Sequence, residues 1–309
     1  MKQNLLVFIL LLSLLTGCTA AAEETAPSAG FTFIDDLGRT VTVTDTGRTA
    51  TLLGSFAQIW MLSGGEVCAT ADDAWVDLHL ALPEDTVNLG NIKELSLEML
   101  LSSQPDFILA SANTRQHLEW KEVLEATGIP VAYFHVADFA DYLRLLKLCT
   151  DLTGRCDLYK KNGLDIQEQI DSVLKKSAQR SNAPTVLCLR ASASLITVKN
   201  SRDNVLGEML SALGCINIAD SETSLLENLS IERILEADPD YIFVVQRGDD
   251  EAGMIANVAS MMAENPAWQQ LTAVKEGRLL YLDKNLYNLK PNHRWGEAYE
   301  QLEEILRNG

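Results

Sequence analysis

Short apolar runs alternate with amphipathic stretches along the first half of the chain. Residues 31–34 and 40–44 alternate apolar and polar positions around Asp36-Leu37-Gly38, and this pattern predicts a β-hairpin. Further apolar runs predict strands at residues 50–54, 67–70, 107–110 and 131–134. Helical spacing predicts helices between them, at residues 56–62 and 115–126. Such alternation predicts a parallel sheet covered by helices on both faces.

The second half repeats this alternation after a long helical stretch. Residues 139–179 keep helical spacing without a strand, with breaks only near Gly154 and Gly163. Strands are then predicted at 185–189, 241–245 and 278–282, and helices at 204–213 and 292–307. The chain therefore predicts an N-terminal α/β lobe over residues 31–152, a connecting helix over 153–180 and a C-terminal α/β lobe over 181–309.

An internal repeat relates the two predicted lobes. Residues 95–110 recur as residues 229–244 with a constant offset of 134, and seven of the 16 positions are identical. Each copy predicts a helix capped by Ser, a Pro-Asp turn and a buried strand. The lobes are thus expected to be related copies of one unit.

The first thirty residues predict an export signal and a tether. Lys2 precedes an apolar run at residues 5–15, which is too short to cross a membrane because a spanning helix needs about 20 residues. The following Leu15-Thr16-Gly17-Cys18 resembles the bacterial lipobox. That resemblance implies a lipoprotein signal peptide over residues 1–17, lipidation of Cys18, a flexible tether over residues 18–30, and a lipid-anchored protein on the extracytoplasmic face of the cell membrane. An ordinary secretory signal with a chance cysteine is the alternative.

Composition and charge narrow the function classes. The 309 residues are 47% hydrophobic and 22% charged, as in an average globular protein. The formal net charge of −18 argues against partners such as nucleic acid or anionic membrane surfaces. With Cys18 lipidated, five cysteines without CxxC spacing remain, which predicts small buried side chains and neither a disulfide framework nor a zinc site.

Motifs for catalysis or cofactor binding are missing from the sequence. The chain contains no HExxH, GxSxG, Walker or GxGxxG motif. Its four histidines are widely spaced, which argues against a preformed metal site. The carboxylate runs at residues 72–73 and 249–251 are suitable for Ca²⁺ but are expected to be solvated loops. No catalytic residue, metal or cofactor is therefore predicted, and the protein is not expected to be an enzyme.

Taken together, segments spread over residues 31–306 resemble the substrate-binding proteins of ABC importers for iron–siderophores, haem and cobalamin. The resemblance is carried by the order and spacing of the hairpin, the Gly64-Gly65 turn, the 87–90 segment leading into Leu97-Glu98, the two Pro-Asp turns, Asn265-Pro-Ala-Trp268 and residues 273–281. It implies two Rossmann-like lobes joined by one rigid backbone helix, with the ligand in the cleft between them and little hinge motion. Ligands of such open α/β sheets lie beyond the carboxyl ends of the strands.

The resemblance also implies a function and its site residues. We expect a monomeric receptor that captures an iron chelate, a siderophore or haem, and delivers it to a permease dimer. A cobalamin receptor, a surface-anchored hydrolase or lyase, and a structural or sensory lipoprotein remain alternatives. Basic residues of the second lobe favour an anionic chelate over cobalamin. The expected ligand contacts are Phe56, Trp75, Asn91, Asn113, Arg115, Arg190, Arg247, Tyr287, Lys290 and Arg294.

Glu98 and Glu232 occupy the same position in the two repeats, two residues after the predicted Ser cap. In the family, a surface glutamate from each lobe meets arginine pockets on the permease, and the resemblance assigns that role to this pair. The alternative needs no partner, because a carboxylate in the first turn of a helix offsets the helix dipole by about 0.3–1 kcal/mol.

Overall fold

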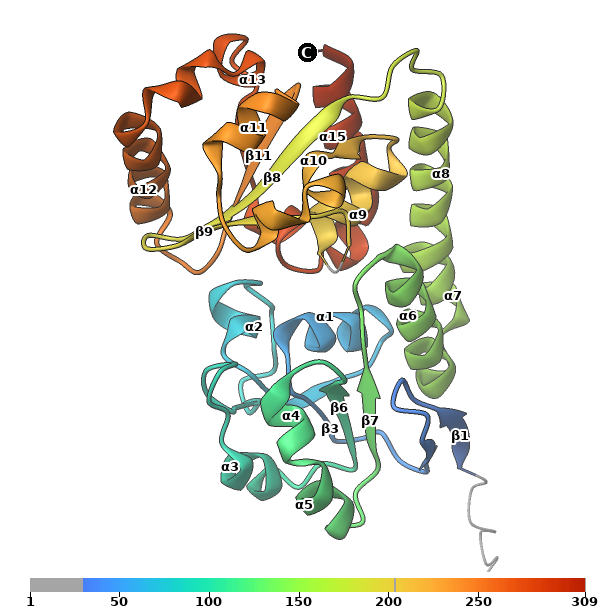
Figure 1. Cartoon of the computed structure of the whole chain (residues 1–309). Coiled ribbons are helices and arrows are strands. Elements are labelled where there is room, and N and C mark those ends of the chain that lie inside the picture. The colour runs from blue at the N-terminus through green and yellow to red at the C-terminus, as the bar shows by residue number, and fades with distance from the viewer. Residues whose placement is uncertain (1–29, 203, 309) are drawn as a thin grey trace, which may run out of the picture.

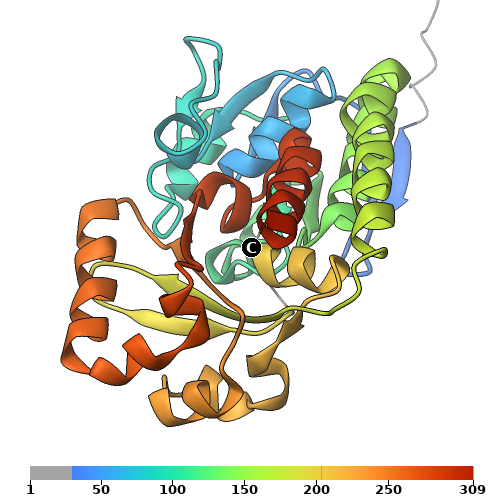
Figure 2. The ribbon, with the colours of Figure 1, turned by 90° about the horizontal axis from the view of Figure 1, so that it is seen from above.

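The computed structural model describes residues 30–202 and 204–308. The predicted signal peptide, the predicted lipidation site Cys18 and all but the last residue of the predicted tether lie outside this range. Two α/β lobes are stacked, and a column of helices runs along one side of both (Figure 1). A view along the stacking direction shows the same column at the edge of the molecule (Figure 2). This confirms the predicted fold class of two α/β lobes joined by a long helix.

The N-terminal lobe is built on a fully parallel sheet. Its strand order is β5-β4-β3-β6-β7, and a separate antiparallel hairpin, β1-β2, precedes it as predicted. The strands are β1 (Phe31–Ile34), β2 (Thr40–Val43), β3 (Thr49–Thr51), β4 (Val67–Thr70), β5 (Val87–Asn88), β6 (Phe107–Ser111) and β7 (Val131–Phe134). The helices are α1 (Gly54–Leu62), α2 (Asp73–Val76), α3 (Leu97–Ser102), α4 (Arg115–Glu119) and α5 (Lys121–Ala126).

Two predicted elements of this lobe differ from the structure. The strand predicted over 50–54 ends at Thr51, because the chain already turns into α1 at Gly54, whose N–H donates to Asp73 at 2.9 Å. The single helix predicted over 115–126 is divided into α4 and α5 at Trp120. Its ψ of −8° interrupts the regular helix while its side chain packs against the apolar core of the lobe.

The lobes are connected by an antiparallel pair of helical segments. Helix α6 (Phe139–Thr153) ends at Gly154, which has a φ of +72°, a left-handed conformation that glycine adopts without strain. The chain then returns as one continuous helix made of α7 (Cys156–Tyr159), a π-helical turn η1 (Lys160–Leu164) and α8 (Asp165–Ser177). The π-turn is fixed to the N-terminal lobe, because Asn162 Nδ2 donates to the carbonyl of Leu62 at 2.8 Å. The predicted break near Gly163 is thus a π-turn and not a helix end.

The C-terminal lobe contains a mixed sheet. Strands β10-β8-β11-β12 are parallel, and β9 pairs antiparallel with the end of β8. The strands are β8 (Thr185–Ala191), β9 (Ile196–Lys199), β10 (Ile216–Asn217), β11 (Tyr241–Gln246) and β12 (Leu279–Leu282). The β8-β9 hairpin lacks the glycine or asparagine that usually marks such a turn, and the Ser192 hydroxyl instead accepts from the N–H of Leu195 at 3.1 Å.

The helices of this lobe cover the sheet and end the chain. They are α9 (Val205–Ala212), α10 (Ile218–Ser221), η2 (Thr223–Leu226), α11 (Ile231–Ala237), α12 (Glu251–Glu264), η3 (Pro266–Gln270), α13 (Thr272–Lys275), α14 (Lys284–Tyr287), η4 (Asn292–Arg294) and α15 (Trp295–Asn308). Helix α12 was not predicted. The carboxylate run at residues 249–251 is exposed as predicted, and Asp250 in addition caps α12 by accepting from the N–H of Gly253 at 2.8 Å.

The internal repeat has the predicted structure in both lobes. Ser96 caps α3 by accepting from the N–H of Met99 at 3.2 Å, and Ser230 caps α11 by accepting from the N–H of Arg233 at 3.5 Å. The strands that follow, β6 and β11, have only buried residues.

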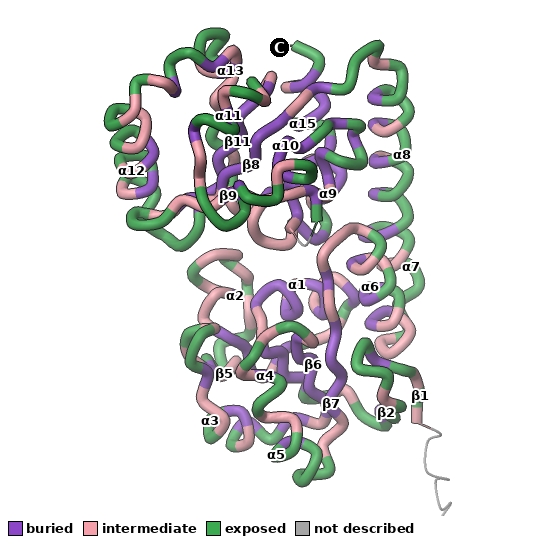
Figure 3. The backbone as a smooth tube through the Cα atoms, in the orientation of Figure 1, coloured by how far each residue is buried: buried purple, intermediate pink, exposed green. Residues whose placement is uncertain are grey.

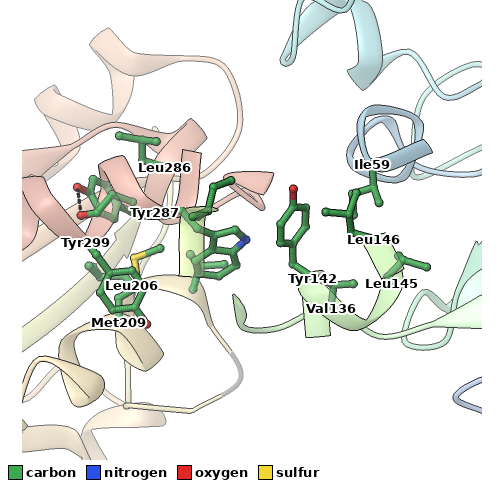
Figure 4. Packing of buried hydrophobic residues seen from close by; sticks show 14 of the residues in the cluster. Ile59, Val136, Tyr142, Leu145, Leu146, Leu206, Met209, Leu286, Tyr287 and Tyr299 are labelled. Atoms are coloured by element: carbon green, nitrogen blue, oxygen red, sulfur yellow. Dashed lines mark hydrogen bonds between the residues drawn. The ribbon is translucent and has the colours of Figure 1, made fainter. Parts of the chain in front are cut away.

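A continuous apolar core joins the two lobes (Figures 3 and 4). It contains Trp60 and Tyr142 from the N-terminal side and Trp295 and Tyr299 from α15. Phe139 of α6 contacts Trp295 edge-on, with ring centroids 6.2 Å apart. The lobes are therefore held together by buried apolar contacts beside the helical column.

The five described cysteines are all free thiols. Cys149, Cys188 and Cys215 are buried as predicted, whereas Cys68 is half-buried and Cys156 is exposed. Within residues 30–202 and 204–308, no helix is both long and apolar enough to cross a membrane.

Candidate ligand-binding cleft

Two adjoining cavities lie between the lobes, beyond the carboxyl ends of the strands. The inner cavity has a volume of about 300 Å³, and the outer cavity a volume of about 680 Å³. Both are lined by residues of the two lobes, and they share Arg190 and Asn288. This is the position in which open α/β sheets bind their ligands.

Three basic residues line the inner cavity. Arg190 at the end of β8, Lys199 at the end of β9 and Lys290 after α14 line it, and none of its described lining residues is acidic. The first turn of α9 also lines the cavity through Val205 and Leu206, so the positive end of a helix dipole adds to the field. In a chain with a net charge of −18, this arrangement is suited to an anion.

Arg190 is the cation whose charge is least compensated. Its Nε atom is buried without a hydrogen-bond partner. Burial lowers the pKa of the Arg190 guanidinium, and the nearby charge of Arg247 lowers it further. A bound oxyanion stabilises such a guanidinium, because it accepts hydrogen bonds from the free N–H groups. Its negative charge also opposes the two causes that lower the pKa, burial and the charge of Arg247.

Lys290 lies at the junction of the two lobes. Its ammonium is 5.9 Å from the ring centroid of Phe56, and the lysine makes no ion pair or hydrogen bond with the described part of the chain. Burial lowers the pKa of Lys290, and only the charge of Asp73 opposes this shift. Lys290 is thus a second cation that is available to a bound anion.

The N-terminal lobe contributes neutral polar groups to the inner cavity. Asn113 follows β6, and its Nδ2 is 2.8 Å from Nδ1 of His135, which follows β7. The Ser111 hydroxyl donates to Asn113 Oδ1 at 2.6 Å, so the amide orientation is fixed and Nδ2 is the donor to the imidazole. This network leaves the proton of a neutral imidazole on Nε2, where it is a donor.

The outer cavity has acidic residues on one wall and basic residues on the other. Three carboxylates and one lysine line it from the N-terminal lobe: Asp72, Asp73, Asp77 and Lys93. Three basic residues and one carboxylate line it from the C-terminal lobe: Arg190, Arg247, Lys284 and Asp249. Burial raises the pKa of the Asp73 carboxyl to about 6, although the N–H of Gly54 donates to it. The walls are therefore electrostatically complementary across the cleft.

The structure brings most of the expected contacts to these cavities. Asn113, Arg190, Tyr287 and Lys290 line the inner cavity, Asn91 and Arg247 line the outer one, and Phe56 lies beneath Lys290. Tyr287 lines the inner cavity, but its hydroxyl is already engaged, because it donates to the carbonyl of Ala298 at 3.1 Å.

The remaining expected contacts lie outside the two cavities. Arg115 on α4 is 92% exposed and pairs with Glu119 at 2.7 Å. Arg294 pairs with Glu297 in the first turn of α15, also at 2.7 Å. Trp75 of α2 is half-buried and lines neither cavity.

Several lining residues were not among the expected contacts. His135 follows a predicted strand as Asn113 does, so the same rule applied to β7 finds it. Lys199 was not an expected contact, because the strand that it ends, β9, was not predicted. Asn204 and Asn288 have no signal in the sequence that places them at the cleft.

Glu98 and Glu232 are exposed residues in the first turns of α3 and α11, one in each lobe. A backbone hydrogen bond and one from the Ser230 hydroxyl, at 2.9 Å, lower the pKa of Glu232. The hydrogen bond from Ser230 forms within the chain, so the lowered pKa of Glu232 does not require a permease partner.

Comparisons with known proteins agree with this geometry. A family model described as "Periplasmic binding protein" matches residues 50–286. The iron-uptake system-binding protein of Bacillus subtilis (strain 168) is 25% identical over 286 residues, which cover 89% of each chain. Among solved structures, S. aureus SirA complexed with staphyloferrin B has a TM-score of 0.67 and 19% identity, covering 90% of this chain and 98% of SirA. S. aureus IsdE complexed with heme has a TM-score of 0.68 and 15% identity, covering 84% and 98% of the two chains.

Proposed function

We propose, from the premise that this chain belongs to the periplasmic binding protein family, that it captures an anionic iron chelate between its lobes and releases it to an ABC importer. The family and its related structures support a substrate-binding role. We further propose the identity of the chelate, the lipid anchor and the delivery to a permease.

One observation carries the choice of ligand. Arg190, Lys199 and Lys290 line the inner cavity, and no described lining residue is a carboxylate. Oxyanion-rich ligands gain the charge-assisted hydrogen bonds that Arg190 and Lys290 can donate, whereas a neutral or cationic ligand would leave these two cations without an anion in the cavity. The relatives support iron as the cargo, because the B. subtilis protein is named for iron uptake and SirA holds staphyloferrin B.

The side chains of the inner cavity favour a carboxylate chelate over haem. A haem-binding site supplies an axial ligand such as His, Tyr or Cys. Here the Tyr287 hydroxyl is bonded to Ala298, burial raises the pKa of the Cys188 thiol, and Nδ1 of His135 is paired with Asn113. His135 Nε2 would be able to ligate iron only after losing the proton that this pairing leaves on it. Cobalamin is favoured still less, because it makes little use of three cations.

The proposed role needs an anchor and a docking surface. We assign the anchor to Cys18 of the lipobox-like segment and place the protein on the extracytoplasmic side of the membrane. We assign permease docking to Glu98 and Glu232, because the internal repeat places one in each lobe. The receptor is proposed to act as a monomer and to release its ligand chemically unchanged.

One observation favours a second function. The Asp73 carboxyl in the outer cavity has a pKa raised to about 6, as in a general acid or base of a hydrolase or lyase. However, Asp73 already accepts from the first N–H of α1 at 2.9 Å, which gives it a structural role. A binding function accounts for the basic residues of the inner cavity, which an enzymatic role for Asp73 would leave unexplained.

Ligand titration tests the proposal. Tryptophan fluorescence of the purified protein is followed while ferric citrate, haemin, cyanocobalamin or iron-free citrate is added. We expect saturable binding of ferric citrate that is at least about tenfold tighter than binding of haemin or cyanocobalamin, which corresponds to one charge-assisted hydrogen bond. Mass spectrometry should recover the chelator intact. Preferred binding of haemin or cyanocobalamin would refute the carboxylate chelate, and a converted product would favour the enzyme.

A further inference from the structure

One segment of the C-terminal lobe crosses the cleft and is fastened to the N-terminal lobe at both ends. We call residues 284–292, from α14 to η4, the interlobe strap. At its start, Lys284 Nζ donates to Asp77 of the N-terminal lobe at 2.8 Å. At its end, Asn292 Nδ2 donates to the carbonyl of Ser55 at 3.0 Å and to Gln58 Oε1 at 2.7 Å. Between these points, Tyr287, Asn288 and Lys290 line the inner cavity.

The two attachments differ in character. Asn292 is fully buried against α1 and has a φ of +51°, so this end is part of the packed core. Lys284 and Asp77 instead line the outer cavity, and their side chains are 20% and 19% exposed. The Lys284 end can therefore open while the Asn292 end stays in place.

Lys284 is shared between the two lobes. The same ammonium donates to Asp249 of its own lobe at 2.7 Å. Burial alone would lower the pKa of Lys284, but its hydrogen bonds to Asp249 and Asp77 raise it, so the ammonium stays charged. Among the ion pairs of residues 30–202 and 204–308, Lys284–Asp77 is the one that joins opposite walls of the cleft.

We propose that the Lys284–Asp77 ion pair is a latch that holds the lobes together over the outer cavity and must open for a ligand to reach or leave the inner cavity. Arg190 and Asn288 line both cavities, so the two adjoin, and the proposed path of the ligand to the cations runs through the outer one. The latch needs no ligand, because the bond between Lys284 and Asp77 forms in the protein alone. Its effect on ligand exchange rests on the proposed function.

The arrangement predicts an order among three substitutions. Lys284→Met removes the ammonium and leaves Asp77 and Asp249 facing each other, so repulsion replaces attraction. Asp77→Asn removes only the attraction across the cleft. Asp249→Asn is the control, because it makes the same change on the same ammonium at nearly the same distance within one lobe. Asp249 also faces Asp77 across the cleft, and loss of its charge relieves repulsion there, so this variant should not loosen the cleft.

Hydrogen exchange of the ligand-free protein tests the latch directly. Peptides covering residues 73–80 and 284–292 should exchange about fivefold faster in Asp77→Asn, faster still in Lys284→Met, and within about twofold of the parent in Asp249→Asn, as for loss of a partly buried ion pair. Unchanged protection of β6 and β11 shows that each variant is folded. Equal exchange in Asp77→Asn and Asp249→Asn would overturn the latch, and so would no change in Lys284→Met.

Stopped-flow dissociation of ferric citrate then tests the effect on the site. Release should accelerate by about fivefold in Asp77→Asn and more in Lys284→Met, with Asp249→Asn near the parent rate. Parent-like release from Lys284→Met would remove the gating role. If ferric citrate does not bind the parent protein, the proposed function fails, whereas the hydrogen-exchange result still decides whether the latch exists.

Discussion

Arg190 provides a test in which stability and binding change in opposite directions. Its Nε is buried without a partner, and Arg247 is close enough to lower its pKa. The ligand-free protein therefore bears the cost of an uncompensated cation that a bound anion would relieve. Arg190→Met keeps an unbranched apolar stem and removes the charge, so we expect a more stable protein that binds its ligand poorly.

The size of both effects follows from the surroundings of the guanidinium. Replacing a buried, poorly compensated charge by an apolar side chain of similar volume is neutral or stabilising by up to about 4 kcal/mol. Because Arg190 lies at the wall of a cleft and is only half-buried, solvent screens the charge, and we expect about 1 kcal/mol. In a chain of this size that raises the unfolding midpoint by roughly 2 °C. Loss of charge-assisted hydrogen bonds worth about 1.5–3 kcal/mol weakens anion binding by roughly 10- to 150-fold.

Two measurements on one pair of variants check this expectation. Thermal unfolding without ligand gives the stability, and calorimetric titration with ferric citrate gives the affinity. Arg115→Met is the matched control, because Arg115 is 92% exposed on α4 and lines neither interlobe cavity, so neither quantity should change. A less stable Arg190→Met protein, or one that binds ferric citrate as tightly as the parent, would refute the reasoning.

Two further predictions concern the permease surface and the response to acid. The double variant Glu98→Ala/Glu232→Ala should keep its unfolding midpoint and its affinity for ferric citrate. Uptake in a reconstituted assay should fall roughly tenfold or more, since each exposed carboxylate would contact the permease. Full uptake would refute docking through this pair. His117 is fully buried, and burial lowers its pKa from 6.5 to about 4. The unfolded chain therefore binds the extra proton first, and up to roughly 3 kcal/mol of stability is lost as the pH falls from 6.5 towards 4. Urea unfolding at pH 7 and pH 4.5 should show a smaller loss in His117→Leu than in the parent, and equal losses would contradict the assignment.

The fold was predictable because its signals are local and repeated. Buried parallel strands such as β6 and β11 appear as short apolar runs, and the Ser-capped helices before them recur at a fixed offset. The elements that were missed lack such signals. The β8-β9 turn is closed by the Ser192 hydroxyl without glycine, and α12 begins with a carboxylate run that also suits a solvated loop.

The site was only partly predictable, because a cleft is lined by segments that are distant in sequence. Asn113 and Arg190 follow the ends of predicted strands, so the general rule for open sheets places them near a ligand. Arg294 is similar to Lys290 in charge and position along the chain, yet it pairs with Glu297 at the start of α15. The sequence does not show which of two neighbouring cations finds a carboxylate, since that depends on how η4 turns the chain.

The two lobes share one folding unit, but their contributions to the cleft have diverged. All three cations of the inner cavity come from the C-terminal lobe, whereas the N-terminal lobe offers the Asn113–His135 pair and an acidic outer wall. An anion is therefore attracted to the C-terminal wall and repelled by Asp72, Asp73 and Asp77 opposite. When Arg190 and Arg247 are neutralised by a ligand, that acidic wall loses part of its attraction for the C-terminal lobe, and Lys284 remains to hold Asp77. The same few charged side chains thus determine both which ligand charge is attracted and how the lobes are held together. These side chains lie outside the repeated helix–turn–strand unit, which only fixes the positions of the strands they follow.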